Sequence, residues 1–176
     1  MSGRSKILGG FIAVFLCGCL VCLPARNGAF HFDDFHHIVD NPAVKDPPGW
    51  AFFFTNPESF SNLGKPTLYR PVTMLSFVLN RKLSQDNPAG FLLVNILVHG
   101  LNAGLFFLFL LRRQKQYLPA LLGAMLFACA AVVSQPVSYV SNRASLLAVF
   151  FILLALSFDQ SSQETNGPEK ILSIAL

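Results

Sequence analysis

Two adjacent carboxylates, Asp33 and Asp34, stand among aromatic residues and histidines in the first third of the chain. Adjacent carboxylates repel each other and raise each other's proton affinity, so a partly dehydrated pair can act as a general base, a hydrogen-bonding partner or a metal ligand. Such a pair can equally cap a helix or sit in a solvated turn. His31, His36 and His37 are further possible metal ligands, but their spacing matches no strong metal-binding template. We therefore expect a candidate catalytic pair with neither a metal nor a cofactor.

Two arginines, Arg70 and Arg143, are the cations best placed by the sequence to meet an anionic ligand. A guanidinium group can bind a phosphate through two parallel hydrogen bonds. It can also extend from a membrane helix to the lipid headgroups without binding any ligand. The local sequence leaves both alternatives open at both positions.

The composition indicates that these residues are held by a membrane protein. Of 176 residues, 53% are hydrophobic and only 12% are charged, and the mean hydropathy is +0.52. A soluble domain is usually about one quarter charged, so a typical cytosolic enzyme and a disordered chain are both excluded. The net charge of +4 is spread out, with no basic stripe among aromatics, and nucleic-acid binding is not expected.

Four apolar runs are long enough, or nearly so, to cross a hydrocarbon core that needs roughly 20 helical residues. They cover residues 7–23, 90–111, 118–140 and 144–158. Pro136 lies near the end of the third run, where a kink or termination is expected. The fold class is therefore all-α and polytopic, with about four transmembrane helices.

The chain divides accordingly into four parts, whose orientation follows from the basic residues in the short segments. Residues 1–25 hold the first span, 26–89 a long outer loop, and 90–158 the second to fourth spans. Basic residues before the first span and at 112–115 predict that these two places are cytoplasmic. The outer loop is then periplasmic or lumenal, and we expect a bacterial inner membrane. Residues 159–176 are predicted to form a cytoplasmic loop and the start of a fifth span that is cut short.

The outer loop also contains segments suited to the membrane surface. Trp50 and the phenylalanines at 52–54 are typical of the headgroup level. From Pro71, apolar residues recur at spacings of three or four as far as Leu83, which predicts an amphipathic helix lying along the bilayer. Membrane lipids are thus expected partners.

Polar residues recur on one face of the second span. Asn95, His99 and Asn102 are spaced by four and three, and polar groups in membrane helices usually turn towards other helices or a water-filled cavity. Hydrogen bonding between helices is the simpler interpretation.

The cysteines provide one alternative for the amino terminus. Cys17, Cys19 and Cys22 lie in the first apolar run and Cys129 in the third, which favours small buried side chains over disulfides or a zinc site. The sequence Leu16–Cys19 behind two basic residues also loosely resembles a bacterial lipoprotein signal, which would place a lipid on Cys19.

An ordered set of short motifs resembles the amino-terminal membrane region of tetratricopeptide-repeat glycosyltransferase-like proteins, which include bacterial members and the animal transmembrane O-mannosyltransferases. The resemblance covers about residues 29–156. Its motifs are Phe32-Asp33-Asp34, Ile38-Val39-Asp40-Asn41-Pro42, Tyr69-Arg70-Pro71-Val72-Thr73, Leu93-Val94-Asn95 with His99, Gln135-Pro136-Val137 with Tyr139-Val140, and Asn142-Arg143-Ala144-Ser145.

This resemblance implies a C-type glycosyltransferase fold, of which this chain holds only a part. Such enzymes transfer a sugar from a polyprenyl-phosphate carrier to an acceptor hydroxyl. By analogy Asp33 is the base and Asp34 positions it. The resemblance also implies four substrate-binding residues. Arg70 and Arg143 are expected to contact the lipid phosphate, and Tyr69 and His99 to bind substrate as well.

The chain departs from the family pattern in two respects. Cys129-Ala130-Ala131 replaces a His-Pro pair usual in relatives, and the family has more spans than this chain. We therefore expect the chain to be inactive alone, and a second polypeptide could complete the fold. The acceptor, a protein or a glycan, is not identified. The alternative function is a noncatalytic membrane scaffold whose outer loop binds a protein or lipid.

Overall fold

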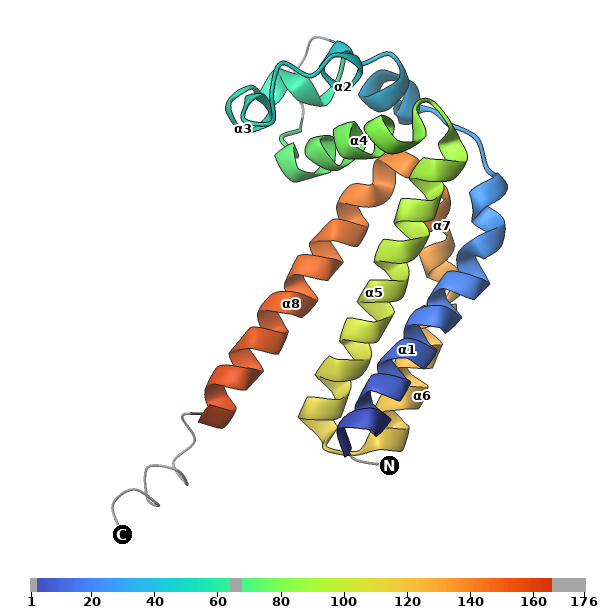
Figure 1. The fold of residues 1–176 in the computed structure, drawn as a ribbon, viewed down its shortest axis with the longest axis vertical. Helices are drawn as coiled ribbons and strands as arrows, with labels where there is room; N and C mark the ends of the chain where they lie inside the picture. The colour runs from blue at the N-terminus through green and yellow to red at the C-terminus, as the bar shows by residue number, and fades with distance from the viewer. Residues whose placement is uncertain (1–2, 64–67, 166–176) are drawn as a thin grey trace.

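The computed structural model describes residues 3–63 and 68–165, and every regular element in that part of the chain is helical. Long helices form one body of the molecule, and short helices gather at one end of it (Figure 1). The long helices are α1 (Gly3–Cys22), α5 (Pro88–Gln114), α6 (Tyr117–Cys129) and α8 (Arg143–Thr165). The all-α prediction is confirmed.

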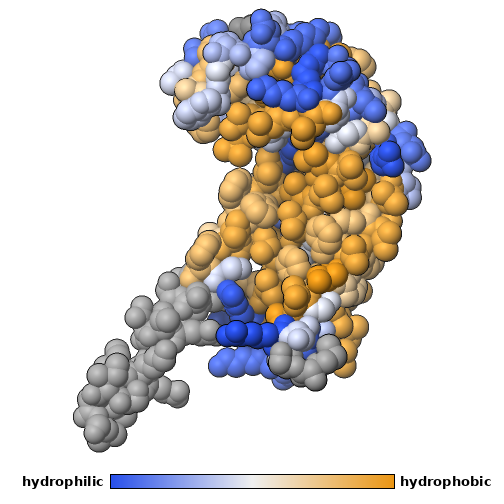
Figure 2. Space-filling view, in the orientation of Figure 1, coloured by the Kyte–Doolittle hydropathy of each residue, from blue (hydrophilic) through white to orange (hydrophobic). Residues whose placement is uncertain are grey.

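Within the described residues, three segments are long and apolar enough to cross a membrane: residues 3–27, 88–114 and 140–158. A fourth span is reached if α6 and the short helices after it, η4 (Ala131–Val133) and α7 (Ser134–Ser138), count as one bent span. Figure 2 shows a broad apolar band over these helices, with hydrophilic residues gathered at both ends. Exposed leucines contribute to the apolar surface; Leu126 is 75% exposed. The protein is therefore an integral membrane protein.

The third span differs from its prediction in where it bends. We expected a kink or an end near Pro136, but the chain already breaks at Ala130, with a bend of 47° between the two helical parts. Pro136 lies in the first turn of α7, where a backbone N–H has no partner within the helix, so its missing donor costs nothing there. α7 ends at Ser138, two residues later.

The helix that contains the fourth span continues beyond residue 158, where the predicted span ends. α8 continues as a helix to Thr165, so the predicted loop beginning at residue 159 starts in helical conformation. Near this end, the Arg112 guanidinium donates to the carbonyl of Ser157 at 2.8 Å, which ties α8 to the end of α5. The predicted fifth span at 171–176 lies outside the described residues.

Small residues let α1 approach α5 closely. A Cβ atom at Gly100 would lie 2.6 Å from the Cys19 sulfur, and one at Gly104 would lie 2.6 Å from the ring of Phe11. Close backbone approach through small residues is the usual way in which membrane helices associate, because lipid provides no hydrophobic force between them. α6 joins them through Ala120, Ala124 and Ala128, which are spaced by four residues and fully buried.

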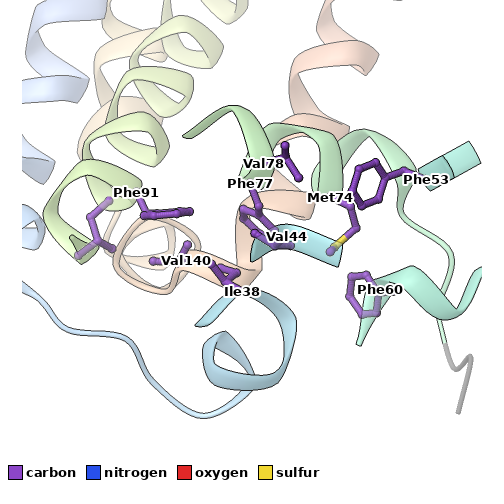
Figure 3. Close-up of a cluster of buried hydrophobic side chains, with 10 residues drawn as sticks. Ile38, Val44, Phe53, Phe60, Met74, Phe77, Val78, Phe91 and Val140 are labelled. Carbon is purple, nitrogen blue, oxygen red and sulfur yellow. The ribbon is translucent and has the colours of Figure 1, made fainter. Parts of the chain in front are cut away.

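The outer loop folds over the end of the long helices. Its elements are η1 (Leu23–Asn27), the π-helical turn η2 (Phe35–Val39), α2 (Pro42–Lys45), α3 (Phe52–Thr55), η3 (Pro57–Phe60) and α4 (Pro71–Ser84). The short helix η5 (Val140–Asn142), which comes much later in the sequence, packs with them. They enclose an apolar cluster at this end (Figure 3). The members of the cluster are Ile38, Val44, Phe53, Phe60, Met74, Phe77, Val78, Phe91, Leu92 and Val140.

α4 is the helix expected from Pro71. Phe77 on its inner face is fully buried in the apolar cluster, whereas Leu79 and Leu83 are 55% and 87% exposed. Trp50 is 72% exposed on the same loop. Exposed apolar side chains beside the spans suit an element that rests on a bilayer surface, which stays a prediction here.

The arrangement gives a testable topology. Asn62 is exposed in the outer loop, and Gln114 is exposed at the end of α5, next to the turn into α6. In a variant without the four native cysteines, Asn62→Cys should react with an impermeant maleimide from outside the cell, and Gln114→Cys only after permeabilisation. The reverse labelling pattern would contradict the predicted orientation and an external position of the site.

Candidate functional site

The two adjacent carboxylates have opposite surroundings. Asp34 is fully buried and accepts hydrogen bonds from the backbone N–H groups of Ser141 at 2.7 Å and His31 at 3.0 Å. The side chain of Asp33 is 56% exposed. Backbone geometry separates them, because Phe32 has a positive φ of 44° and a helical turn begins at once after it. One carboxylate thus holds the loop while the other faces outwards.

Asp33 lines an open cleft of about 750 Å³ at the outer end of the long helices. Residues of η1 and the segment after it also line the cleft, as do residues around α7: Pro24, Ala25, Asn27, Gly28, Gln135, Ser138 and Tyr139. The backbone N–H of Asp33 donates to the Tyr139 hydroxyl at 3.2 Å. The cleft can therefore admit a hydroxyl-bearing molecule next to a carboxylate.

Asp33 is held as a carboxylate. Partial burial raises its pKa, but hydrogen bonds with His36 and Tyr139 and the nearby histidines outweigh burial, so the pKa lies below its ordinary value. Burial, together with the hydrogen bond to Asp33, raises the pKa of Tyr139 to about 12. Tyr139 therefore remains a hydroxyl donor beside an ionised Asp33 at neutral pH.

Two neighbouring histidines lie next to Asp33 and contact serines from other segments of the chain. His36 Nε2 lies 3.2 Å from Asp33 Oδ1, and its Nδ1 lies 2.9 Å from the Ser61 hydroxyl. His37 Nδ1 lies 3.2 Å from the Ser141 hydroxyl. Burial, then the positive charges of His36 and Arg70, lowers the pKa of His37 to about 4 against the opposing effect of Asp33, so His37 is neutral.

Arg70 belongs to the same surface through a series of ring contacts. Its guanidinium carbon lies 5.5 Å from the centre of the Phe60 ring. The Phe60 and His37 rings are 4.2 Å apart, and the rings of His37 and His36 are 4.1 Å apart. Asp33 and Arg70 are therefore linked by contacting side chains. Tyr69, the neighbour of Arg70, donates its hydroxyl to the carbonyl of Phe54 at 2.7 Å and is 52% exposed.

Arg70 also heads a second groove, of about 430 Å³, between α4 and α8. Its walls are apolar apart from Thr73 and Ser145, and include Val72, Leu147 and Phe151. A cation at the head of an apolar groove suits a molecule with an anionic group and a hydrocarbon chain.

Arg143 does not occupy the position that we expected. It is fully buried, so its guanidinium neither extends to the headgroups nor faces an open cleft. Nε donates to Asn95 Oδ1 at 2.8 Å, and Nη2 donates to Asn80 Oδ1 at 2.7 Å and to the Phe91 carbonyl at 2.8 Å. Nη1 completes the set on the carbonyl and hydroxyl oxygens of Ser76 at 3.3 and 3.4 Å. With its donors engaged inside the protein, Arg143 has a structural position instead of a phosphate contact.

His99 is likewise buried between helices, away from the cleft. Its Nε2 lies 3.1 Å from the Ala128 carbonyl of α6. Asn95 donates to the carbonyls of Val137 and Tyr139, and Asn102 to that of Leu146 at 2.9 Å. This polar face of α5 makes hydrogen bonds between helices, as its spacing indicated, and the structure does not bring His99 to a substrate.

Comparisons with known proteins find similar sequences over most of this chain. Protein O-mannosyl-transferase F38B6.6 of Caenorhabditis elegans is 33% identical over 174 residues, which cover 93% of this chain and 25% of that protein. Protein O-mannosyl-transferase TMTC4 of Mus musculus is 34% identical over 187 residues, 94% of this chain and 24% of that protein. Over most of its length this chain is therefore similar to the amino-acid sequences of protein O-mannosyltransferases, including one of the TMTC type.

The relationship extends along the chain but covers a minor part of the homologues. Protein O-mannosyl-transferase TMTC1 of Mus musculus matches 91% of this chain at 34% identity and 17% of its own length. The chain thus spans about a quarter or less of these relatives. No protein-family model matches it, and no solved structure matches it. The predicted bacterial inner membrane stays a prediction.

Sequence reasoning missed several residues of the site. Tyr139 and Gln135 line the cleft, and Ser61 and Ser141 orient the two histidines. Tyr139 and Gln135 did appear in the ordered motifs, but nothing in their local sequence placed them opposite Asp33. The useful signal was the group of polar residues at 134–142, which is unusual inside a predicted span.

The two carboxylates should differ in their effect on folding. Asp34→Asn replaces one accepting oxygen by an NH₂ group that faces a backbone N–H, so a buried donor loses its partner at a cost of about 1–3 kcal/mol. We expect a lower thermal midpoint for purified Asp34→Asn and little change for Asp33→Asn. Equal midpoints for both variants would contradict the structural role of Asp34.

The stability of the fold should depend on the planar guanidinium group of Arg143 as well as on its charge. Arg143→Lys keeps the charge but offers three donors from one nitrogen to acceptors on two helices. Each buried acceptor left without a donor costs about 1–3 kcal/mol, so the thermal midpoint should fall. Arg113→Lys, at an exposed arginine, is the matched control. A midpoint for Arg143→Lys as high as that of the control would overturn the buried hydrogen-bond set.

Proposed function

We propose that this chain forms part of a glycosyltransferase that moves a sugar from a polyprenyl-phosphate carrier to an acceptor hydroxyl. The observation that carries the proposal is the exposed, ionised Asp33 in an open cleft at the outer end of the spans. The names of the homologues suggest mannose as the sugar and a protein as the acceptor.

Asp33 is the proposed general base. Its carboxylate takes the proton of the acceptor hydroxyl while the acceptor oxygen attacks the anomeric carbon of the sugar. The bond from that carbon to the phosphate oxygen breaks, and polyprenyl phosphate leaves. Removing a general base typically costs about a hundredfold to ten-thousandfold in rate. Asp34 is a positioning residue, since its two backbone hydrogen bonds fix the turn that presents Asp33.

Arg70 is the proposed contact to the phosphate of the donor. Arg70 contacts the ring of Phe60, which is linked to Asp33 through the two histidines, and it also lines the groove between α4 and α8. The apolar walls of that groove suit the first isoprene units of the donor. Tyr69 anchors the same segment through the Phe54 carbonyl, so its proposed part in substrate binding is to hold Arg70 in place. Arg143 and His99 have no part in this proposal, because both are engaged between helices.

The activity of the homologues resides in proteins about four times as long or longer, so the test uses a chimera. This chain would replace the matching part of the mouse TMTC4 protein, and transfer of labelled mannose from polyprenyl-phosphate mannose to protein would be measured. Asp33→Asn should reduce the rate by about a hundredfold or more at equal expression. Arg70→Ala should raise the apparent KM for the donor.

Asp46→Asn is the matched control, because Asp46 is an exposed carboxylate of the same loop outside the cleft. Its rate should equal that of the unchanged chimera. An active chimera that tolerates Asp33→Asn would exclude the base and favour the scaffold function. Loss of activity at Asp34→Asn in a normally folded chimera, without loss at Asp33→Asn, would exchange the two roles.

A further inference from the structure

Three side chains on one face of the outer loop bring metal-ligating atoms together. One ligand atom from each of Asp33, His36 and His37 lies within 4.8 Å of the others. His36 Nε2 and Asp33 Oδ1 are separated by 3.2 Å. Ligands about 2.0–2.1 Å from a tetrahedral ion are about 3.3 Å apart, so this pair already has the required separation.

The backbone explains why the sequence spacing gave no sign of this cluster. Asp33 precedes the π-helical turn Phe35–Val39, in which the chain advances by more residues per turn than in an α-helix. Both following histidines are thereby kept on the side of Asp33, and their rings lie 4.1 Å apart. His31, before the turn, is not part of the cluster.

Each histidine is oriented by a serine from another segment. The Ser61 hydroxyl lies 2.9 Å from His36 Nδ1, and the Ser141 hydroxyl lies 3.2 Å from His37 Nδ1. When each Nδ1–H donates to its serine, each Nε2 presents a lone pair. A serine hydroxyl can donate or accept, so this tautomer needs no movement of heavy atoms. Histidines that bind metal ions usually have such a partner on their second nitrogen.

We propose that Asp33, His36 and His37 form a binding site for a divalent transition-metal ion of the Zn²⁺ class. Two imidazoles and one carboxylate are a ligand set that Zn²⁺ accepts, with a further position open to a water or a substrate oxygen. The ion would replace the hydrogen bond between His36 and Asp33. The positive charge of Arg70 acts on His37, and the carboxylate of Asp33 acts in the opposite direction. The exposure of Asp33 to the cleft gives the ion a path of entry.

The test measures binding of the metal alone, so its result is independent of glycosyl transfer. The full chain, without a histidine tag, is purified in detergent, stripped with a chelator and titrated with Zn²⁺. Bound zinc is counted by mass spectrometry, and Co²⁺ is used in parallel because its visible spectrum reports coordination. We expect about one ion per chain and a tetrahedral Co²⁺ spectrum.

His36→Ala and Asp33→Asn should abolish this binding, and Ser61→Ala should weaken it by about tenfold to a hundredfold. His31→Ala, at an exposed histidine five residues from His36, is the matched control and should bind as the unchanged chain does. The thermal midpoint of each stripped variant shows that it is folded. No stoichiometric binding by the unchanged chain, or equal loss in His31→Ala and His36→Ala, would overturn the proposal.

Discussion

A buried cation determines how the outer part of this protein is built. The Arg143 guanidinium remains charged when buried, and an unpaired buried charge is very costly, so its donors must all find acceptors. Asn80 and Ser76 provide them from α4, and Asn95 and the Phe91 carbonyl from α5. The rings of Phe77 and Phe91 lie 4.9 and 5.7 Å from the guanidinium carbon and exclude water. These contacts fix α4, α5 and the start of α8 relative to one another.

The position of Asp33 follows from that arrangement. Fixing the start of α8 also fixes Ser141, whose N–H meets Asp34 across 107 positions of sequence, and Asp34 interacts electrostatically with Arg143. The hydroxyl of Ser141 also lies within hydrogen-bonding distance of His37 Nδ1. Ser141 is hydrogen-bonded to both Asp34 and His37, which holds the turn between them in place. Asp33 directly precedes this turn and lines the cleft. Precision at the site thus comes from contacts between distant segments more than from the short loop helices.

The parts of this structure that the sequence predicts are those with a periodic or compositional signal. Long apolar runs predicted the spans, and spacings of four and three predicted the polar contacts of Asn95 and His99 between helices. Arg143 could not be assigned in this way, because its acceptors come from separate helices and no local pattern distinguishes a buried arginine from one at the headgroups. The choice between Asp33 and Asp34 likewise depends on Ser141. The break at Ala130 had no proline to signal it.

The two roles proposed for Asp33 concern the same oxygen atoms and are alternatives in any one molecule. An ionised carboxylate has about four lone-pair positions, and His36 Nε2 lies 3.2 Å from Oδ1 of Asp33. Asp33 lines the cleft and is exposed there, so an acceptor hydroxyl can approach the carboxylate. A cation shared with His36 and His37 would withdraw charge from the carboxylate and lower its proton affinity, because a nearby positive charge favours the ionised form. The metal would therefore weaken Asp33 as a base while offering the acceptor oxygen a ligand position of its own.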